Sequence, residues 1–227
     1  MINTLLIGGR GSIGAGLRTY LQKLDPHYQI TSIDLPGAED KATDPAAQCL
    51  FVDLDIAEDP KSFGKLLEGR DLVVFLARTT PHEAMMALTD LVYESVCRFC
   101  PKALIIGSSS VHAVDAAYWP FDREPYATIA ARRFDELDAW PEPLSALMEA
   151  CPTSEYGKEK AYAEEWTRRL ADEGMSVVAA RWGGINWRNT NSEEIGYFTV
   201  WCHQEDASQF VDCCLRAHRD NSLRSGA

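Results

Sequence analysis

The most constraining feature of this chain is a glycine-rich turn between a short apolar run and an amphipathic helical pattern. The apolar residues of Asn3–Ile7 predict a buried strand, and residues 13–24 repeat apolar side chains at helical spacing. Between them lies a G-x-x-G-x-x-G series, formed by Gly8, Gly11 and Gly14. Glycines let a backbone approach a pyrophosphate closely, and the helix that follows offers unpaired N–H groups at its positive end. The order of strand, glycine turn and helix predicts a dinucleotide-binding α/β fold.

The rest of the chain repeats this alternation of apolar runs and helical patterns. Five further runs predict strands: Ile30–Asp34, Cys49–Leu54, Leu72–Ala77, Ala103–Ile106 and Ser176–Arg181. Four segments predict helices: Pro60–Leu67, Pro81–Phe99, Tyr156–Glu173 and Asp206–His218. Nearly continuous apolar strands separated by helices are typical of a parallel sheet that is covered on both faces. We therefore predict one Rossmann-like α/β domain over 1–227, with a doubly wound parallel sheet and a small C-terminal substrate region at about 182–227.

One segment, at about 113–155, interrupts this rhythm with five prolines and two tryptophans. It is too aromatic for a free linker, so we expect an excursion packed over the carboxyl edge of the sheet, with a helix near Ile129–Leu137. Ligands bind at that edge in open α/β sheets. The excursion is therefore either a lid or substrate wall, or a structural flap or dimer surface.

An acidic residue, Asp34, ends the second predicted strand about 20 residues after the turn. Its carboxylate can accept hydrogen bonds from the adenosine ribose and would repel a 2′-phosphate, which favours NAD over NADP. Arg10 is the opposing signal, because an arginine there could hold that phosphate, so NADP stays possible. A tight turn without a ligand is the alternative. We assign cofactor binding to the turn residues Gly8, Arg10, Gly11, Ser12, Ile13 and Gly14.

Tyr156 and Lys160 are four residues apart, so on a helix they share a face. An ammonium near a phenol favours the phenolate, and such a tyrosine can exchange a proton with a substrate while hydride moves to or from a nicotinamide. The pair alone is common on surface helices. Downstream of the glycine turn it indicates a catalytic pair.

A run of three serines, Ser108–Ser110, stands at the carboxyl end of the fifth predicted strand. A hydroxyl there would lie at the sheet edge beside the nicotinamide and could bond the reacting oxygen. Serines also cap strands and turns, and only the Tyr156–Lys160 pair makes the catalytic interpretation preferable.

Together these motifs resemble the short-chain dehydrogenase/reductase superfamily, in its extended branch of NAD-dependent epimerase/dehydratase-like proteins. The resemblance runs from Met1 to about Ala217. It is carried by the glycine series, Asp34, Val52–Leu54, Phe75–Ala77, the serine run, Y-G-K-E-K at 156–160 with Ala163–Glu164, and Arg181–Gly183.

The resemblance implies a role for each matching residue. Asp53 and Leu54 would lie beside the adenine, and Leu76 and Ala77 would line the cofactor channel. In the catalytic Ser/Tyr/Lys set the tyrosine is the acid/base and the serine orients the substrate. The lysine, Lys160, would favour the phenolate and hold the nicotinamide ribose. A homodimer is also implied.

Within the branch, Ser109–Val114 is similar to the S-S-N-H stretch of uronate and hexose dehydrogenases, and Thr199–Trp201 followed by Glu205–Asp206 echoes their C-terminal pattern. This alignment makes Ser110 the catalytic serine, with Ser109 as the alternative, and turns His112 toward the substrate. Two departures stand out, because Val111 replaces the asparagine of that stretch and Met85 lies where the branch has another asparagine.

The net charge and the cysteine content restrict the kinds of molecule and metal that the protein is expected to bind. The formal net charge is −12, and with no lysine- or arginine-rich run we expect neither nucleic acid nor a membrane surface as a partner. Seven scattered cysteines are typical of reduced thiols and of a cytoplasmic protein. Cys97 and Cys100 have the spacing of half a metal site, but no second pair matches, so we expect no metal.

The sequence therefore predicts an NAD(P)-dependent oxidoreductase that acts on a hydroxyl or carbonyl of a small polar substrate, a sugar or sugar acid. A nucleotide-sugar epimerase or dehydratase, and a non-catalytic NAD(P)-binding regulatory protein, are the alternatives.

Overall fold

The computed structural model describes residues 1–42, 49–118, 123–191 and 200–223. Trp119 and Pro120 of the excursion, and Thr199 of the C-terminal pattern, lie outside the described residues. The six strands are β1 Ile2–Ile7, β2 Tyr28–Asp34, β3 Leu50–Asp53, β4 Leu72–Phe75, β5 Leu104–Ser110 and β6 Val177–Trp182. The helices are α1 Ser12–Leu24, α2 Pro60–Leu67, α3 His82–Phe99, α4 Tyr126–Ala130, α5 Glu155–Asp172 and α6 Gln204–Arg219, with 3-10 helices η1 Val111–Ala117 and η2 Phe134–Glu136.

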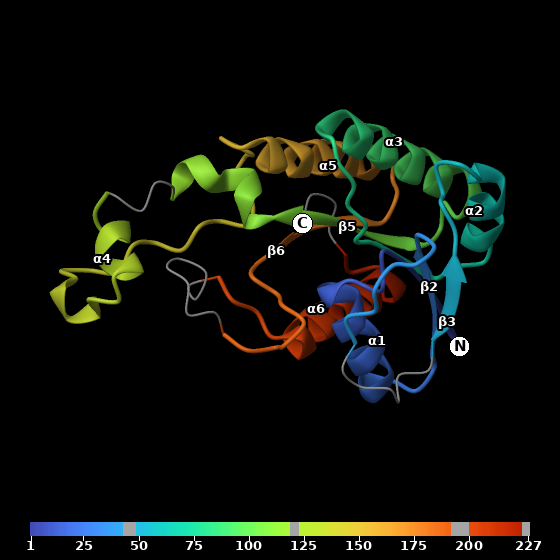
Figure 1. Ribbon diagram of the computed structural model, residues 1–227, viewed down its shortest axis with the longest axis horizontal. Helices are drawn as coiled ribbons and strands as arrows, with labels where there is room; N and C mark the ends of the chain where they lie inside the picture. Colours follow the sequence, from blue (N-terminus) through green and yellow to red (C-terminus); the bar gives the residue numbers. More distant parts are fainter. Residues whose placement is uncertain (43–48, 119–122, 192–199, 224–227) are drawn as a thin grey trace.

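The strands form one sheet in the order β3-β2-β1-β4-β5-β6, and every pair is parallel. The order reverses between β1 and β4, as in doubly wound folds. Helices α2, α3 and α5 cover one face of the sheet, and α1 and α6 cover the other (Figure 1). The predicted Rossmann-like class is confirmed, and all carboxyl ends of the strands meet at one edge.

Each face of the sheet has its own hydrophobic core, because successive strand residues point to opposite faces. Leu5, Val73 and Ile105 pack with the helices of one layer, including Phe63 on α2 and Trp166 on α5. The neighbouring strand residues pack on the other side with α1 and α6: Leu6, Val74, Ile106, Leu17 and Val211. None of the described helices combines the length and apolar character needed to cross a membrane.

The excursion differs from its prediction. The helix expected near Ile129–Leu137 is wrong, because α4 ends at Ala130 and only η2 follows. Arg132 has a φ of 57°, a left-handed conformation that stops an α-helix. Of the described parts of this segment, the two ends pack at the sheet edge. Its middle extends away from the sheet (Figure 1), where Phe134 and Trp140 stack on each other at 5.7 Å between ring centroids.

Candidate active site

The glycine turn packs tightly against the end of β4 at one position and against itself at another, and it leaves room for a Cβ at a third. Gly8 has a φ of 87°, and a Cβ there would lie 2.5 Å from the Ala77 nitrogen. A Cβ on Gly14 would lie 2.4 Å from the Cα of Gly9. At Gly11, by contrast, the nearest atom would be the Gly8 carbonyl oxygen at 3.5 Å. Gly11 also begins α1 without a side-chain cap and with no acidic residue in the first turn, as an anion site requires.

Asp34 ends β2 opposite Asp53, which ends β3. Its Oδ2 accepts hydrogen bonds from the Arg10 backbone N–H at 3.0 Å and from the Ser32 hydroxyl at 2.9 Å. Burial raises the pKa of Asp34, against the effect of these two bonds. The Leu54 N–H donates to the Asp34 carbonyl at 2.9 Å, so the residues predicted to meet the adenosine lie together at this end of the edge.

Arginine side chains at this end are paired with carboxylates. Nη1 of Arg10 lies 2.6 Å from Oδ1 of Asp53, and its guanidinium stands 5.1 Å from the centroid of the Phe51 ring. Buried Arg18 stacks on the same ring at 4.8 Å and pairs with Asp40. The arginine that could have held a 2′-phosphate is therefore occupied by an acidic partner.

The end of β4 connects the glycine turn to Tyr156. The N–H groups of Leu76 and Ala77 both donate to the Ile7 carbonyl at 2.8 Å, which fixes them beside the turn. The next residue, Arg78, places its Cζ 5.0 Å from the centroid of the Tyr156 ring. The glycine turn, the predicted channel residues and the predicted catalytic phenol thus lie along one continuous stretch of the sheet edge.

Tyr156 and Lys160 share a face of α5, as their spacing predicts. Nζ of Lys160 lies 5.3 Å from the centroid of the Tyr156 ring. Only 4% of Lys160 is exposed, and burial lowers the pKa of its ammonium to about 8. The carboxylate of Glu159 opposes this shift, and the positive charge of Arg78 adds to it.

The first turn of α5 is docked onto η1. The Ser154 hydroxyl caps the helix by accepting from the Gly157 N–H at 3.0 Å. A Cβ on Gly157 would lie 2.4 Å from the His112 carbonyl oxygen, so only glycine permits this approach. Buried Asp115 of η1 accepts from the Thr153 N–H at 2.6 Å and from the Ser154 hydroxyl at 3.2 Å. These contacts hold Tyr156 against η1.

His112 of η1 contacts the ring of Tyr156, and Ser110 precedes His112 at the start of this short helix. Ser110 caps this helix, since its hydroxyl accepts from the His112 N–H at 3.3 Å. The His112 ring stands edge-on to the Tyr156 ring, with 5.4 Å between centroids. Ser109 points the other way and donates to Oε1 of Glu164 at 2.5 Å. Ser110 therefore caps the short helix whose His112 contacts Tyr156, whereas Ser109 is bonded to Glu164.

Sequence analysis did not identify Arg78 and His82 as residues of this site. Arg78 pairs with Glu159 of α5 through Nε–Oε2 at 3.0 Å and Nη2–Oε1 at 3.3 Å. His82 lies beside them, with Nδ1 3.7 Å from Glu159 Oε1 and without a hydrogen-bond partner. A signal was present, because Glu159 belongs to the Y-G-K-E-K motif and Arg78 directly follows Leu76–Ala77.

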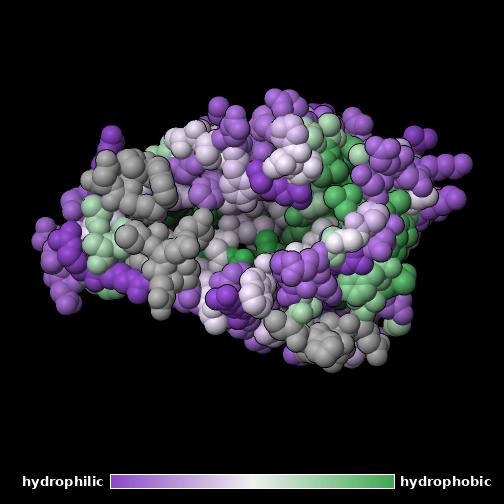
Figure 2. Space-filling view, viewed as in Figure 1, coloured by the Kyte–Doolittle hydropathy of each residue, from purple (hydrophilic) through white to green (hydrophobic). Residues whose placement is uncertain are grey.

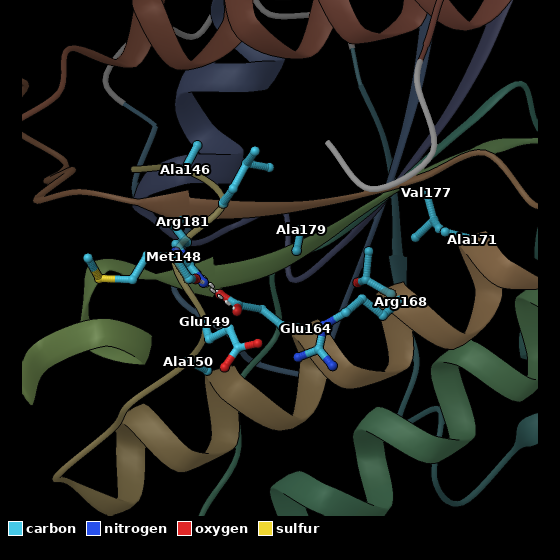
Figure 3. A pocket seen from close by; sticks show the side chains of 12 residues that line it. Ala146, Met148, Glu149, Ala150, Glu164, Arg168, Ala171, Val177, Ala179 and Arg181 are labelled. Atoms are coloured by element: carbon cyan, nitrogen blue, oxygen red, sulfur yellow. Dashed lines mark hydrogen bonds and ion pairs between the residues drawn. The ribbon is translucent and has the colours of Figure 1, made fainter. Parts of the chain in front are cut away.

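A cavity of about 530 Å³ lies elsewhere, between α5, the outer edge of β6 and residues 146–150 (Figure 3). Its wall includes the ion pair of Arg181 and Glu164 at 2.7 Å, and Arg181 also donates to the Met148 carbonyl at 2.6 Å. None of the predicted site residues lines this cavity. Figure 2 shows a separate hollow in the same face as Figure 1, between α5 and α6, with hydrophobic residues at its floor.

The cysteines include the pair Cys97 and Cys100, which has the spacing of half a metal site. Within the described ranges, no three His, Cys, Asp or Glu side chains are grouped closely enough to share a metal ion. Cys97 and Cys100 are free, and burial raises the pKa of Cys100 to about 12, which keeps it a protonated thiol.

No protein-family model matches the chain, and no curated protein sequence does either. Solved structures are similar in fold. UDP-glucose 4-epimerase from Brucella ovis in complex with NAD has a TM-score of 0.63 and 16% identity, covering 97% of this chain and 75% of the epimerase. dTDP-glucose 4,6-dehydratase from Bacillus anthracis in complex with NAD has a TM-score of 0.61 and 16% identity, covering 82% of this chain.

UDP-glucuronic acid 4-epimerase from Bacillus cereus, in complex with UDP-glucuronic acid and NAD, has a TM-score of 0.56 and 18% identity over 82% of this chain. The chain spans 57% of the dehydratase and 59% of this epimerase. These neighbours are NAD-dependent epimerases and dehydratases, the branch that the sequence motifs resemble. At such identities the similarity shows the fold, and the fold implied by the resemblance is confirmed.

Proposed function

We propose that the chain binds NAD along the glycine turn and transfers hydride to or from a hydroxyl or carbonyl carbon of a small polar substrate, a sugar or sugar acid. One observation carries the proposal. Gly8 packs on Ala77, and the next residue, Arg78, lies over the ring of Tyr156. A dinucleotide that follows the turn would therefore end beside a phenol that has an ammonium 5.3 Å from its ring centroid.

The residues at the turn fit NAD. The open space at Gly11 and the uncapped start of α1 suit a pyrophosphate, and Asp34 and Asp53 suit ribose hydroxyls. Arg10 is already paired with Asp53, and the Asp34 carboxylate would repel a 2′-phosphate, which favours NAD over NADP. Three similar structures contain NAD, which supports the same choice. When bound, NAD would supply the hydride acceptor or donor.

The side chains at the edge would divide the remaining chemistry. The Tyr156 hydroxyl would take or give the substrate proton, and the Lys160 charge would favour its phenolate. The Ser110 hydroxyl would hold the reacting oxygen by a hydrogen bond. His112, half-buried and edge-on to Tyr156, would offer a ring nitrogen to a neighbouring substrate hydroxyl.

A nucleotide-sugar epimerase or dehydratase is the second candidate, since the similar structures carry those names. In such an enzyme the hydride returns to the substrate, and NAD is regenerated within each turnover. Net NADH formation on a free sugar or sugar acid favours the first candidate. Conversion of a nucleotide-sugar without net NADH favours the second.

The test combines cofactor binding with one substitution. NAD should raise the thermal unfolding temperature more than NADP does, and Tyr156→Phe should keep this shift while turnover is lost. Tyr162→Phe is the matched control, because Tyr162 is on the same helix but its hydroxyl bonds to Asp90. Unchanged turnover in Tyr156→Phe would refute the mechanism. NAD binding without activity on a panel of sugars and carbonyl compounds would instead favour the non-catalytic alternative.

A further inference from the structure

Tyr156 has cations on its ring from two different elements. Lys160 reaches it from α5, with 5.3 Å between Nζ and the ring centroid, and Arg78 reaches it from the end of β4, with 5.0 Å between Cζ and the centroid. The His112 ring contacts it from η1, and His112 lies 3.8 Å from the Asp115 carboxylate. The phenol therefore has two positive groups at nearly equal distances.

The buried carboxylate of Glu159 fixes the position of Arg78. Glu159 is 2% exposed and holds the guanidinium through two hydrogen bonds, at 3.0 and 3.3 Å. A buried carboxylate is costly without a partner, and an apolar residue at this position would avoid that cost. A planar guanidinium gripped at two points has little freedom to turn away from Tyr156.

We propose that Arg78 is a positioning residue that provides a second, permanent positive charge for the Tyr156 phenolate, and that Glu159 holds it over the ring. The proposal rests on the proposed function, in which Tyr156 is the acid/base. Lys160 alone would supply a positive charge only up to about pH 8, because its pKa of about 8 means that it loses its proton under mildly alkaline conditions. An arginine keeps its charge throughout that range.

The experiment measures the phenolate absorbance of Tyr156 directly, without cofactor or substrate. Each protein is titrated with alkali beside its Tyr156→Phe counterpart, and the difference isolates this one phenol. Arg78→Gln should move the titration midpoint of Tyr156 upward by about one pH unit, since the guanidinium lies 5.0 Å from the ring centroid and a neighbouring opposite charge is worth about one to three pH units. Arg78→Lys, which keeps the charge, should restore most of that change. Arg168→Met, an exposed arginine on α5, is the control and should leave the midpoint unchanged.

Glu159→Gln separates charge from structure, and it keeps an acceptor for Arg78 if the first variant fails to fold. Removing a negative charge should move the midpoint of Tyr156 downward, opposite to Arg78→Gln. If both variants move it upward, the pair acts only by holding the helix in place, and the proposal is overturned. An unchanged midpoint in Arg78→Gln overturns it as well.

A rate measurement then distinguishes this proposal from the proposed function. If Tyr156 is the acid/base, Arg78→Gln should lower kcat about tenfold at pH values well below the Tyr156 midpoint, because a one-unit upward shift leaves a tenth of the phenolate there, and the loss should shrink as the pH approaches that midpoint. A shifted midpoint with an unchanged kcat would overturn the positioning role of Arg78. Full turnover in Tyr156→Phe would refute the proposed function, whatever the titration shows.

Discussion

Replacing Lys160 by methionine should make the protein more stable at neutral pH. The pKa of Lys160 falls from 10.5 to about 8 because the ammonium is buried. At about 1.4 kcal/mol per pH unit, the folded state at pH 7 carries a penalty of about 3 kcal/mol relative to the unfolded chain. Methionine has a similar length and no charge, so Lys160→Met should raise the free energy of unfolding by about that amount.

The pH dependence of this gain identifies its cause. The pKa is lower in the folded state, so the penalty is complete below pH 8 and is relieved as the pH rises toward 10.5, where the unfolded lysine also loses its proton. The difference between Lys160→Met and the parent protein should therefore fall below about 1 kcal/mol by pH 10. Comparing the two proteins at each pH removes the contribution of other groups that titrate there, such as buried Cys100.

Urea denaturation at pH 7 and at pH 10 measures both values. Lys158→Met is the matched control, because this exposed lysine lies two residues earlier on α5, and it should change stability little at either pH. A gain in Lys160→Met that is equal at both pH values, or a loss at pH 7, would refute the reasoning. A confirmed gain means that the lysine is retained at a cost in stability, as expected for a residue kept for function.

Five further substitutions test the glycine turn, the serines and Asp34. Gly11→Ala should cost about 1 kcal/mol or less in stability, yet it should weaken NAD binding measured by calorimetry. Gly14→Ala should lower the thermal unfolding temperature severely, because its Cβ would lie 2.4 Å from backbone atoms. Ser110→Ala should lower kcat by about tenfold or more with little change in unfolding temperature, whereas Ser109→Ala should cost about 1–3 kcal/mol through its lost bond to Glu164. Asp34→Ala should reduce the preference for NAD over NADP, measured as the ratio of their dissociation constants; an unchanged ratio would contradict the assigned role.

The elements that sequence analysis located well are those in which one local pattern decides the outcome. The apolar run at Leu72–Ala77 becomes β4, and Pro60–Leu67 is α2 to the residue, with the Asp59 side chain accepting from the Ser62 N–H at its start. β5 continues through Ser110, beyond the predicted end at Ile106, because its backbone pairs with β6 as far as Trp182, and the hydroxyls of Ser108 and Ser109 find partners on opposite faces of the sheet. The polar character of the serines indicated the end of a strand, and the sequence did not show the distant residues that bond to them.

The parts that were missed depend on contacts between distant segments. The Arg78–Glu159 pair joins residues 81 positions apart, so although each residue lies next to a recognisable motif, no local pattern shows that the two are partners. The excursion was misjudged for a related reason. The apolar spacing around Ile129 predicts a longer helix, but the left-handed conformation of Arg132 ends it. Phe134 and Trp140 stack on each other away from the sheet instead of packing on it. The aromatic residues of the excursion indicated that it packs against something, but they did not identify the surface that it packs against.

Buried charge on α5 explains how the edge of the sheet is held in place. Glu159, Lys160 and Glu164 are all nearly inaccessible, and each acidic residue has an arginine from another element as its partner. Arg78 comes from the end of β4, and Arg181 comes from β6. Apolar residues of similar volume would often stabilise such positions as well or better, but they could slide against their neighbours. Paired charges fix the helix at two defined points on the sheet. Because Tyr156 lies on that helix, these ion pairs help to set its distance from the glycine turn, together with the apolar packing of Trp166 and Leu170.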